Sequence, residues 1–296
     1  GELVNTDISK PQRMKIINNL LANIPGRVWD GKEILLDALA ANCEAYKKDS
    51  SFDEEERLLL QKVLEVTLRE CNRNNIVFKL QALICLKKVL KVRLFQMLID
   101  DAFYNQAHKL LMDIYSAEVE QEQLTDEEKQ KMELEMKKKQ KQMEEIRCQI
   151  LELVPLIVPA NNVELFEKEK NYILEKLQNS RLSIQESLSL LQAVYSLVSR
   201  VVTNSTLQEQ VLSPDQLIEV VKILQQQMDP NQRQVVARGK ALEMFSDLIK
   251  LLKSENPNLL SAITPTTLEL LSDARNREKD ATIMLKISAT MQLLSS

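Results

Sequence analysis

The sequence predicts an all-α protein, specifically an α-solenoid of HEAT- or armadillo-like antiparallel helix pairs. Helix-forming residues such as Leu, Lys, Glu and Gln dominate its 296 residues, whereas aromatic residues make up 4% and Gly occurs four times. Apolar residues recur at helical spacing, and helix-start motifs follow one another along the chain. We find no alternating segment long enough to predict a strand.

The helix-start motifs divide the chain into short helices. "SIQE", from Ser183, is a capping box, in which the Ser and Glu side chains bond free amides of the first turn. "SPDQ" from Ser213, "DPNQ" from Asp229, "NPNL" from Asn256 and "TPTT" from Thr264 place Pro at the first helical position. We expect a helix to begin at each motif.

Apolar stripes accompany these starts and indicate one buried face per helix. The clearest stripes are Ile184, Leu188, Leu191, Tyr195, Val198 and Val202; Leu217, Val220, Val221, Leu224 and Met228; and Leu242, Phe245, Leu248, Ile249 and Leu252. The helices pair into units of roughly 40–47 residues, the period of HEAT and armadillo arrays. The expected pairs are 31–73, 75–117, 145–178, 182–228 and 230–275, with a closing helix at 278–296.

One charged segment, residues 116–147, interrupts the repeats. It has a capping box at Thr125–Glu128 and only a narrow apolar seam. We expect a long, largely solvated helix or a partly disordered linker, and the alternative is an arm that pairs with a partner helix. The predicted domains are HEAT-like repeats in 1–117, the charged linker in 118–144, and HEAT-like repeats in 145–296.

Composition excludes several function classes. The formal net charge of −4 argues against nucleic acid as the main partner, and no apolar run approaches the roughly 20 residues of a membrane span. The N-terminus does not resemble a signal peptide, and it lacks an initiator Met, so we expect a processed product or an excised fragment. The four cysteines are scattered and there is one His, which favours buried free thiols in a reducing compartment over a metal site.

No arrangement of residues predicts catalysis. There is no Gly-rich phosphate loop and no candidate triad, so we expect no enzyme activity, catalytic residue, cofactor, metal or small-molecule substrate. We therefore expect a scaffold that binds other proteins.

The stretch "IPGRVWDGKEILLDALA", residues 24–40, contains two glycines and the single Trp. We interpret it as a turn between helices. Gly26 suits a left-handed position, and Asp30 and Glu33 have capping-box spacing. Ile34 is expected to face the core, and Trp29 is placed to staple the turn onto Ile34 or the preceding helix. Arg27 and Lys32 are expected on the rim. The alternative is that the loop is also a contact surface with Trp29 as its anchor.

"GRVWDGKEILLDALAANC" resembles a Gly-Arg-Thr-Trp-x-Gly-Lys-Glu motif near the C-terminal part of the proteasome adaptor and scaffold family, with Val28 in place of Thr. "LRECNRNNIVFKLQALICLKKVLK", residues 68–91, and "RLFQMLI", residues 93–99, resemble the repeat that follows in that family. The residues that match the motif, and that mark the family or a contact loop, are Gly26, Arg27, Trp29, Gly31, Lys32 and Glu33.

The resemblance covers residues 20–100 and implies a C-terminal piece of a divergent member, itself a large HEAT-repeat protein. It implies a non-enzymatic adaptor, cytoplasmic and nuclear, that binds the proteasome and bridges or monitors its core and regulatory particles. The alternatives are a trafficking or transport adaptor of the karyopherin or armadillo type, against which the single Trp argues, and a coiled-coil protein, against which the short seam argues.

Overall fold

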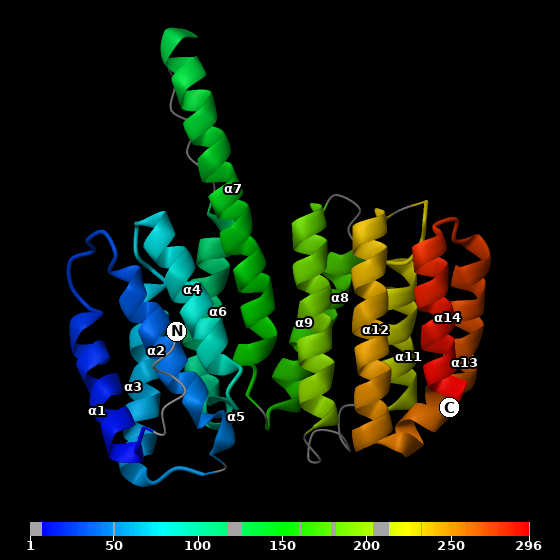
Figure 1. Cartoon of the computed structure of the whole chain (residues 1–296), viewed down its shortest axis with the longest axis horizontal. Coiled ribbons are helices and arrows are strands. Elements are labelled where there is room, and N and C mark those ends of the chain that lie inside the picture. Colours follow the sequence, from blue (N-terminus) through cyan, green and yellow to red (C-terminus); the bar gives the residue numbers. More distant parts are fainter. Residues whose placement is uncertain are drawn as a thin grey trace. The chain divides into compact units, whose positions relative to one another are not determined.

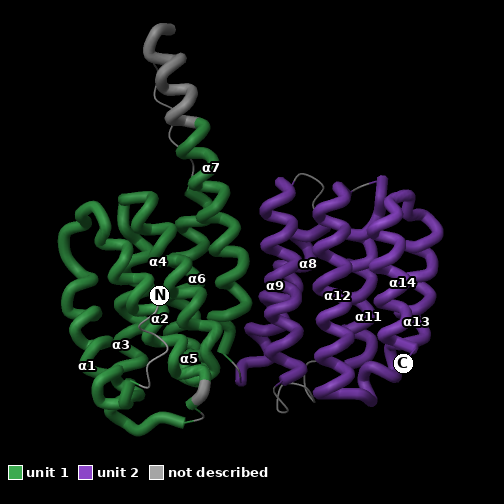
Figure 2. The backbone as a smooth tube through the Cα atoms, viewed as in Figure 1, with its two compact units in different colours: residues 1–159 green, residues 160–296 purple. Residues whose placement is uncertain are grey.

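The computed structural model describes residues 8–49, 51–117, 126–159, 161–178, 182–203, 213–231 and 233–295, without the side chains of Lys48 and residues 126–136. Across these ranges the chain forms thirteen α-helices and one 3₁₀ turn, with no strand (Figure 1). The all-α prediction is therefore confirmed. The chain divides into two compact units, Gly1–Pro159 and Ala160–Ser296 (Figure 2).

The first unit packs its helices in two layers. Helices α2, α4 and the C-terminal part of α7 follow one another in one layer, and α1, α3 and α6 pack against them as α1 on α2, α3 on α4 and α6 on α7. The helices are α1 (Lys10–Asn23), α2 (Glu33–Glu44), α3 (Glu54–Glu70), α4 (Ile76–Leu90), α5 (Arg93–Gln96), α6 (Asp101–Ser116) and α7 (Asp126–Ile157), and the 3₁₀ turn is η2 (Ala45–Lys48).

The second unit repeats the same arrangement. Helices α9, α12 and α14 form one layer, and α8, α11 and α13 form the other. The helices are α8 (Val163–Gln178), α9 (Ile184–Val202), α11 (Pro214–Gln226), α12 (Val235–Glu255), α13 (Pro257–Arg277) and α14 (Ala281–Ser295). Stacked helix pairs in two layers are the arrangement of an α-solenoid.

The pairing of helices differs from the expected pairs. Range 31–73 holds α2 and α3, but α2 packs on α1 and α4, and α3 packs on α4. The hairpins of the first unit are therefore α1–α2, α3–α4 and α6–α7. Helix length and order predict the repeat period, but which neighbour each helix contacts depends on tertiary packing.

Local signals predicted three of the five helix starts. The side chains of Ser183, Ser213 and Asn256 accept hydrogen bonds from amides three residues ahead, at 3.2, 3.3 and 3.0 Å. The other two starts are wrong. Asp229 instead accepts from the Asn231 amide at 2.8 Å, and α12 begins at Val235. Thr264 lies inside α13, which continues through Pro265 because the apolar face on both sides of the proline stays packed.

The apolar stripes of α11 and α12 are buried as predicted. The stripe predicted for α9 is only partly correct, because Ile184 is exposed and Leu188 and Tyr195 are half-buried. Helix α9 instead buries a broader face that includes Leu190, Val194 and Leu197, since it lies between α8 and α12.

Helix α7 carries much of the charged segment. Its side chains at 137–141 are exposed, whereas Ile146, Ile150 and Val154 are buried against the rest of the first unit. Arg147 donates to the carbonyls of Tyr115 and Ala117 at 3.2 and 3.3 Å. Residues 118–125 and the capping box at Thr125–Glu128 lie outside the described side chains, and the boundaries 118–144 stay a prediction.

Candidate functional site

The loop between α1 and α2 is shaped by two glycines. Gly26 has φ +96° and Gly31 has φ +89°, and in the described part of the chain no other residue has a positive φ. A side chain is strained in this conformation, so both positions favour Gly. The left-handed turn expected at Gly26 is present.

Lys32 holds the loop in place from inside the protein. Its side chain is 1% exposed. Its Nζ donates to the carbonyl oxygens of Pro25 at 3.2 Å and Arg27 at 2.9 Å, and lies 5.8 Å from the centroid of the Phe78 ring on α4. The prediction that Lys32 lies on the rim is therefore wrong. Its aliphatic stem packs in the interior, and the loop carbonyls replace water around the ammonium group.

Burial lowers the pKa of Lys32, and the nearby carboxylate of Glu70 partly opposes this effect. Glu70 is itself buried at the end of α3, where it accepts from Arg73 Nε at 2.7 Å and from a second Arg73 nitrogen at 3.1 Å. The loop is thus fixed by polar contacts to its own backbone and by charges at the start of the α3–α4 connection.

Trp29 does not staple the turn. Its side chain is 55% exposed, so the predicted packing role is wrong. The ring lies close to Gly31: a methyl group at that position would be 3.8 Å from Trp29 Cζ3. The Trp29 carbonyl accepts from the Lys32 amide at 3.1 Å, which closes the turn. The loop therefore presents the ring to solvent at the start of α2.

The charged side chains close to Trp29 in the sequence make no polar contact within the described structure. The predicted Asp30–Glu33 capping box is absent, because α2 begins at Glu33 and no side chain caps it. Arg27 and Asp30 are exposed, and Glu33 is half-buried. Among the described residues, the side chains of Arg27, Asp30 and Glu33 form no ion pair or hydrogen bond. All six predicted motif residues lie in this loop or at the first residue of α2. Lys32 is buried where exposure was expected, and Trp29 is exposed where packing was expected.

Two further apolar side chains were not predicted as part of this site. Ile34 on α2 is 65% exposed, so the prediction that it faces the core is wrong, and Val77 on α4 is 54% exposed. Asp37, one turn after Ile34, accepts a hydrogen bond at 2.6 Å from Gln81, one turn after Val77. Because residues one turn apart share a helix face, Ile34 and Val77 lie on the same side of neighbouring helices. We call Trp29, Ile34 and Val77 the Trp29 face.

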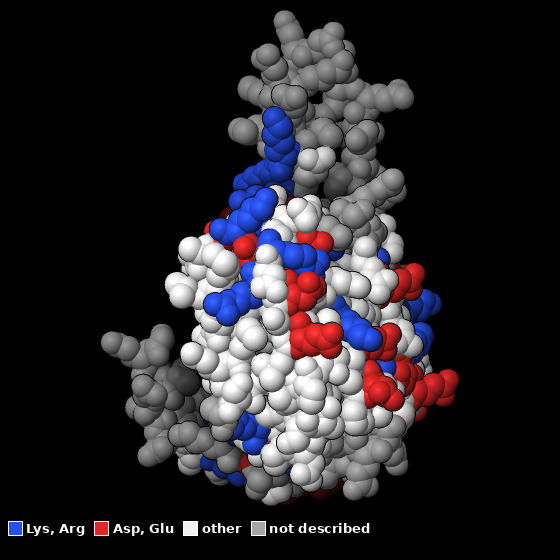
Figure 3. Space-filling view, turned by 90° about the vertical axis from the view of Figure 1, so that its right-hand side faces the viewer, with Lys and Arg blue, Asp and Glu red and all other residues white. Residues whose placement is uncertain are grey.

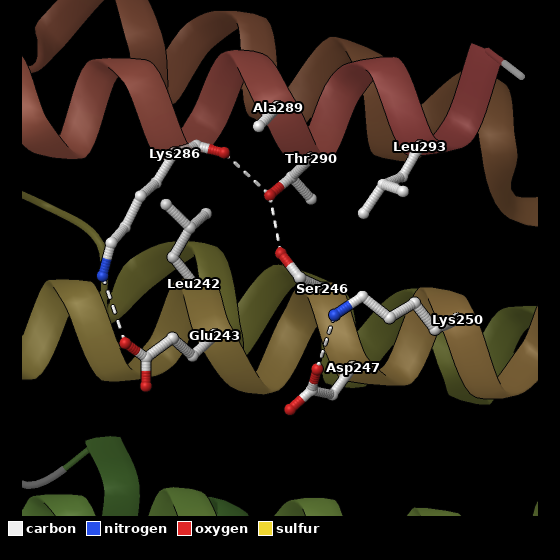
Figure 4. A pocket seen from close by; sticks show the side chains of 9 residues that line it. All are labelled: Leu242, Glu243, Ser246, Asp247, Lys250, Lys286, Ala289, Thr290 and Leu293. Atoms are coloured by element: carbon white, nitrogen blue, oxygen red, sulfur yellow. Dashed lines mark hydrogen bonds and ion pairs between the residues drawn. The ribbon is translucent and has the colours of Figure 1, made fainter.

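A groove of about 440 Å³ in the second unit lies between α12 and α14 (Figure 4). Its polar side chains bond one another: Ser246 with Thr290 at 2.7 Å, Lys286 with Glu243 at 3.1 Å, and Lys250 with Asp247 at 3.0 Å. No pair there combines a nucleophile with a base, so this groove supports helix packing better than chemistry.

Two other surfaces are visible. A groove of about 640 Å³ in the first unit is lined by residues of α1, α3 and α6, including Leu21, Val66 and Leu110. Figure 3 shows the side where α13 and α14 lie, with charged residues spread over the upper half and the right-hand side of the view and a largely uncharged area at the lower left. Leu285 of α14 is strongly exposed.

The described residues contain no cluster of His, Cys, Asp or Glu suited to hold a metal ion. Nor does any described helix combine the length and apolar character needed to cross a bilayer. Cys43, Cys71, Cys85 and Cys148 are buried free thiols, as expected.

The layered helix pairs and the exposed loop define a repeat protein of the armadillo-like α-solenoid class. The profile of the family described as ECM29, C-terminal ARM-like repeats matches residues 46–289. The chain belongs to this family.

A human relative, proteasome adapter and scaffold protein ECM29, is 32% identical over 76 residues. This similarity covers 26% of the chain and 4% of the relative, so the chain spans only a small part of that protein. The family match confirms the resemblance stated from the sequence and extends it beyond residue 100. The Trp29 loop lies just before the matched range.

Proposed function

We propose that this chain is part of a non-enzymatic scaffold that binds the proteasome and bridges or monitors its core and regulatory particles. The observation that carries the proposal is the family match over residues 46–289, together with the relative's description as a proteasome adapter and scaffold protein. We place it in the cytoplasm and nucleus, where proteasomes work.

The molecule's surfaces support this role. Stacked helix pairs offer extended faces to other proteins, and the chain presents a rigid loop with an exposed Trp. The family match favours this scaffold hypothesis over the trafficking or transport adaptor that the helical repeats alone allow. We propose proteins as its partners, and neither nucleic acid, nor membrane insertion, nor a small-molecule substrate.

Affinity purification tests the proposal. The tagged chain is used as bait in a cell lysate, and the eluate is analysed by mass spectrometry. We expect enrichment of subunits of both the core and the regulatory particle over a bait of unrelated helical-repeat protein. Recovery of transport receptors without proteasome subunits would support the alternative and contradict the proposal.

A further inference from the structure

We propose that the Trp29 face is the docking surface for a proteasome subunit, and that it takes an aliphatic protein segment flanked by an acidic and a basic residue. This inference rests on the proposed function and names the surface and the partner chemistry. It joins residues of the loop with residues of α2 and α4.

The first argument is the local concentration of exposed apolar groups. Trp29, Ile34 and Val77 are three of the nine large apolar side chains that are exposed in the described part of the chain. Single exposed apolar residues are common, but an exposed Trp just before one helix and exposed β-branched residues at the starts of that helix and of the helix packed on it are typical of contact surfaces. Trp is also among the residue types that contribute most to binding energy at interfaces.

The second argument is rigidity. The loop uses two left-handed glycines and a buried ammonium group to fix its path, yet the largest side chain it positions points to solvent. Taking a lysine out of water is unfavourable, and the carbonyls of Pro25 and Arg27 offset that cost while Lys32 fixes their positions. A fixed loop loses little freedom on binding, so the same contacts give a higher affinity.

The third argument is charge. Arg27, which precedes Trp29 in the sequence, and Asp30 and Glu33, which follow it, have no partner among the described side chains, whereas nearby Asp37 contacts both Gln81 and Lys88. Two carboxylates against one guanidinium disfavour a phosphate-rich partner. Mixed charges around an apolar centre instead fit a protein segment, with an acidic residue facing Arg27 and a basic residue facing Asp30 or Glu33.

The test uses the whole chain and purified 26S proteasome in a surface-binding assay. We expect Trp29→Ala to weaken binding about 30-fold. Arg27→Glu should weaken binding as well, more strongly at low salt than at high salt. Val236→Ala is the matched control, because Val236 is 63% exposed in the first turn of α12 in the other unit. It should bind as wild type does.

Circular dichroism melts of each variant separate loss of binding from loss of fold. Arg27 is exposed, so Arg27→Glu keeps the test valid even if Trp29→Ala folds poorly. If wild type binds and both loop variants bind equally well, or if Val236→Ala loses as much affinity, the Trp29 face is not the docking surface, although the proposed function stands. If wild type itself does not bind the proteasome, both proposals are wrong.

Discussion

Replacing Lys32 with Met should destabilise the protein although it preserves most of the apolar stem. The change removes the donor that serves the carbonyls of Pro25 and Arg27. An acceptor left unsatisfied costs about 1–3 kcal/mol when it is buried, and less when water can reach it, as at these part-buried carbonyls. Two such groups, less the relief from no longer burying a charge, give a loss of about 1–2 kcal/mol in the free energy of unfolding.

Lys32→Ala should be worse, since it also removes three buried methylenes at about 0.8 kcal/mol each. Chemical denaturation monitored by circular dichroism measures both variants. Lys62→Met is the control, because Lys62 is exposed on α3, and it should change stability by no more than about 0.5 kcal/mol. A Lys32→Met protein with the denaturation midpoint and slope of wild type would refute the role given to Lys32.

The same lysine predicts a pH dependence. Because burial lowers the pKa of Lys32 below the ordinary lysine value of 10.5, the unfolded state binds more protons than the folded state between the folded pKa and pH 10.5. The stability difference between wild type and Lys32→Met should therefore increase as the pH rises through that window, and level off above it. Denaturation curves of both proteins across the window measure this difference. A decrease would contradict the assignment of a buried lysine.

Four further predictions concern other residues. Trp29→Ala should lower the free energy of unfolding by only about 1–2 kcal/mol in a denaturation experiment, because less than half of the Trp29 surface is buried. A loss above about 4 kcal/mol would support the stapling interpretation instead. Arg238→Met should cost about 3–5 kcal/mol, because it leaves the buried Glu278 without the guanidinium that bonds it at 2.8 and 2.9 Å. Burial alone would raise the pKa of Glu278, but hydrogen bonds from the Asp280 and Lys279 amides and from Arg238 lower it. The contribution of Glu278 to the free energy of unfolding, measured as the difference between wild type and Glu278→Gln, should therefore be present above about pH 4.5 and lost as the pH falls through the lowered pKa. A difference in stability that does not change with pH would contradict this. A thiol reagent should label none of the four buried cysteines in the folded protein and all four in denaturant. Burial keeps the reagent out, and it raises the pKa of Cys43 and Cys71 and brings that of Cys85 to about 12. Rapid labelling of the native state would be inconsistent with the structure.

Signals that act within a few residues were readable from the sequence. The caps at Ser183 and Ser213 each involve an amide three residues ahead, and the stripes of α11 and α12 need only helical spacing. The repeat period was readable for the same reason, since it reflects the lengths of helices and turns. These features predicted the fold class.

The errors arise where distant segments decide the outcome. Lys32 is buried because α4 brings Phe78 beside it, and no local rule predicts that contact. Trp29 was expected to staple the turn because it precedes the predicted cap at Asp30, yet Lys32 already holds the turn and leaves the ring exposed. Likewise Ile34 and Val77 become one surface only through the α2–α4 contact. The six motif residues could be selected from the sequence, but their roles required the packing.

The most direct test of the account is site-specific photo-crosslinking to the purified 26S proteasome. A photoreactive amino acid is placed at position 29, and in a second sample at position 236 as the matched exposed site of the other unit. The account predicts that position 29 crosslinks to a defined proteasome subunit, that excess unlabelled wild-type chain suppresses the product, and that position 236 gives none. Absence of a crosslink from position 29, or the same products from both positions, would contradict the claim that this loop contacts the proteasome.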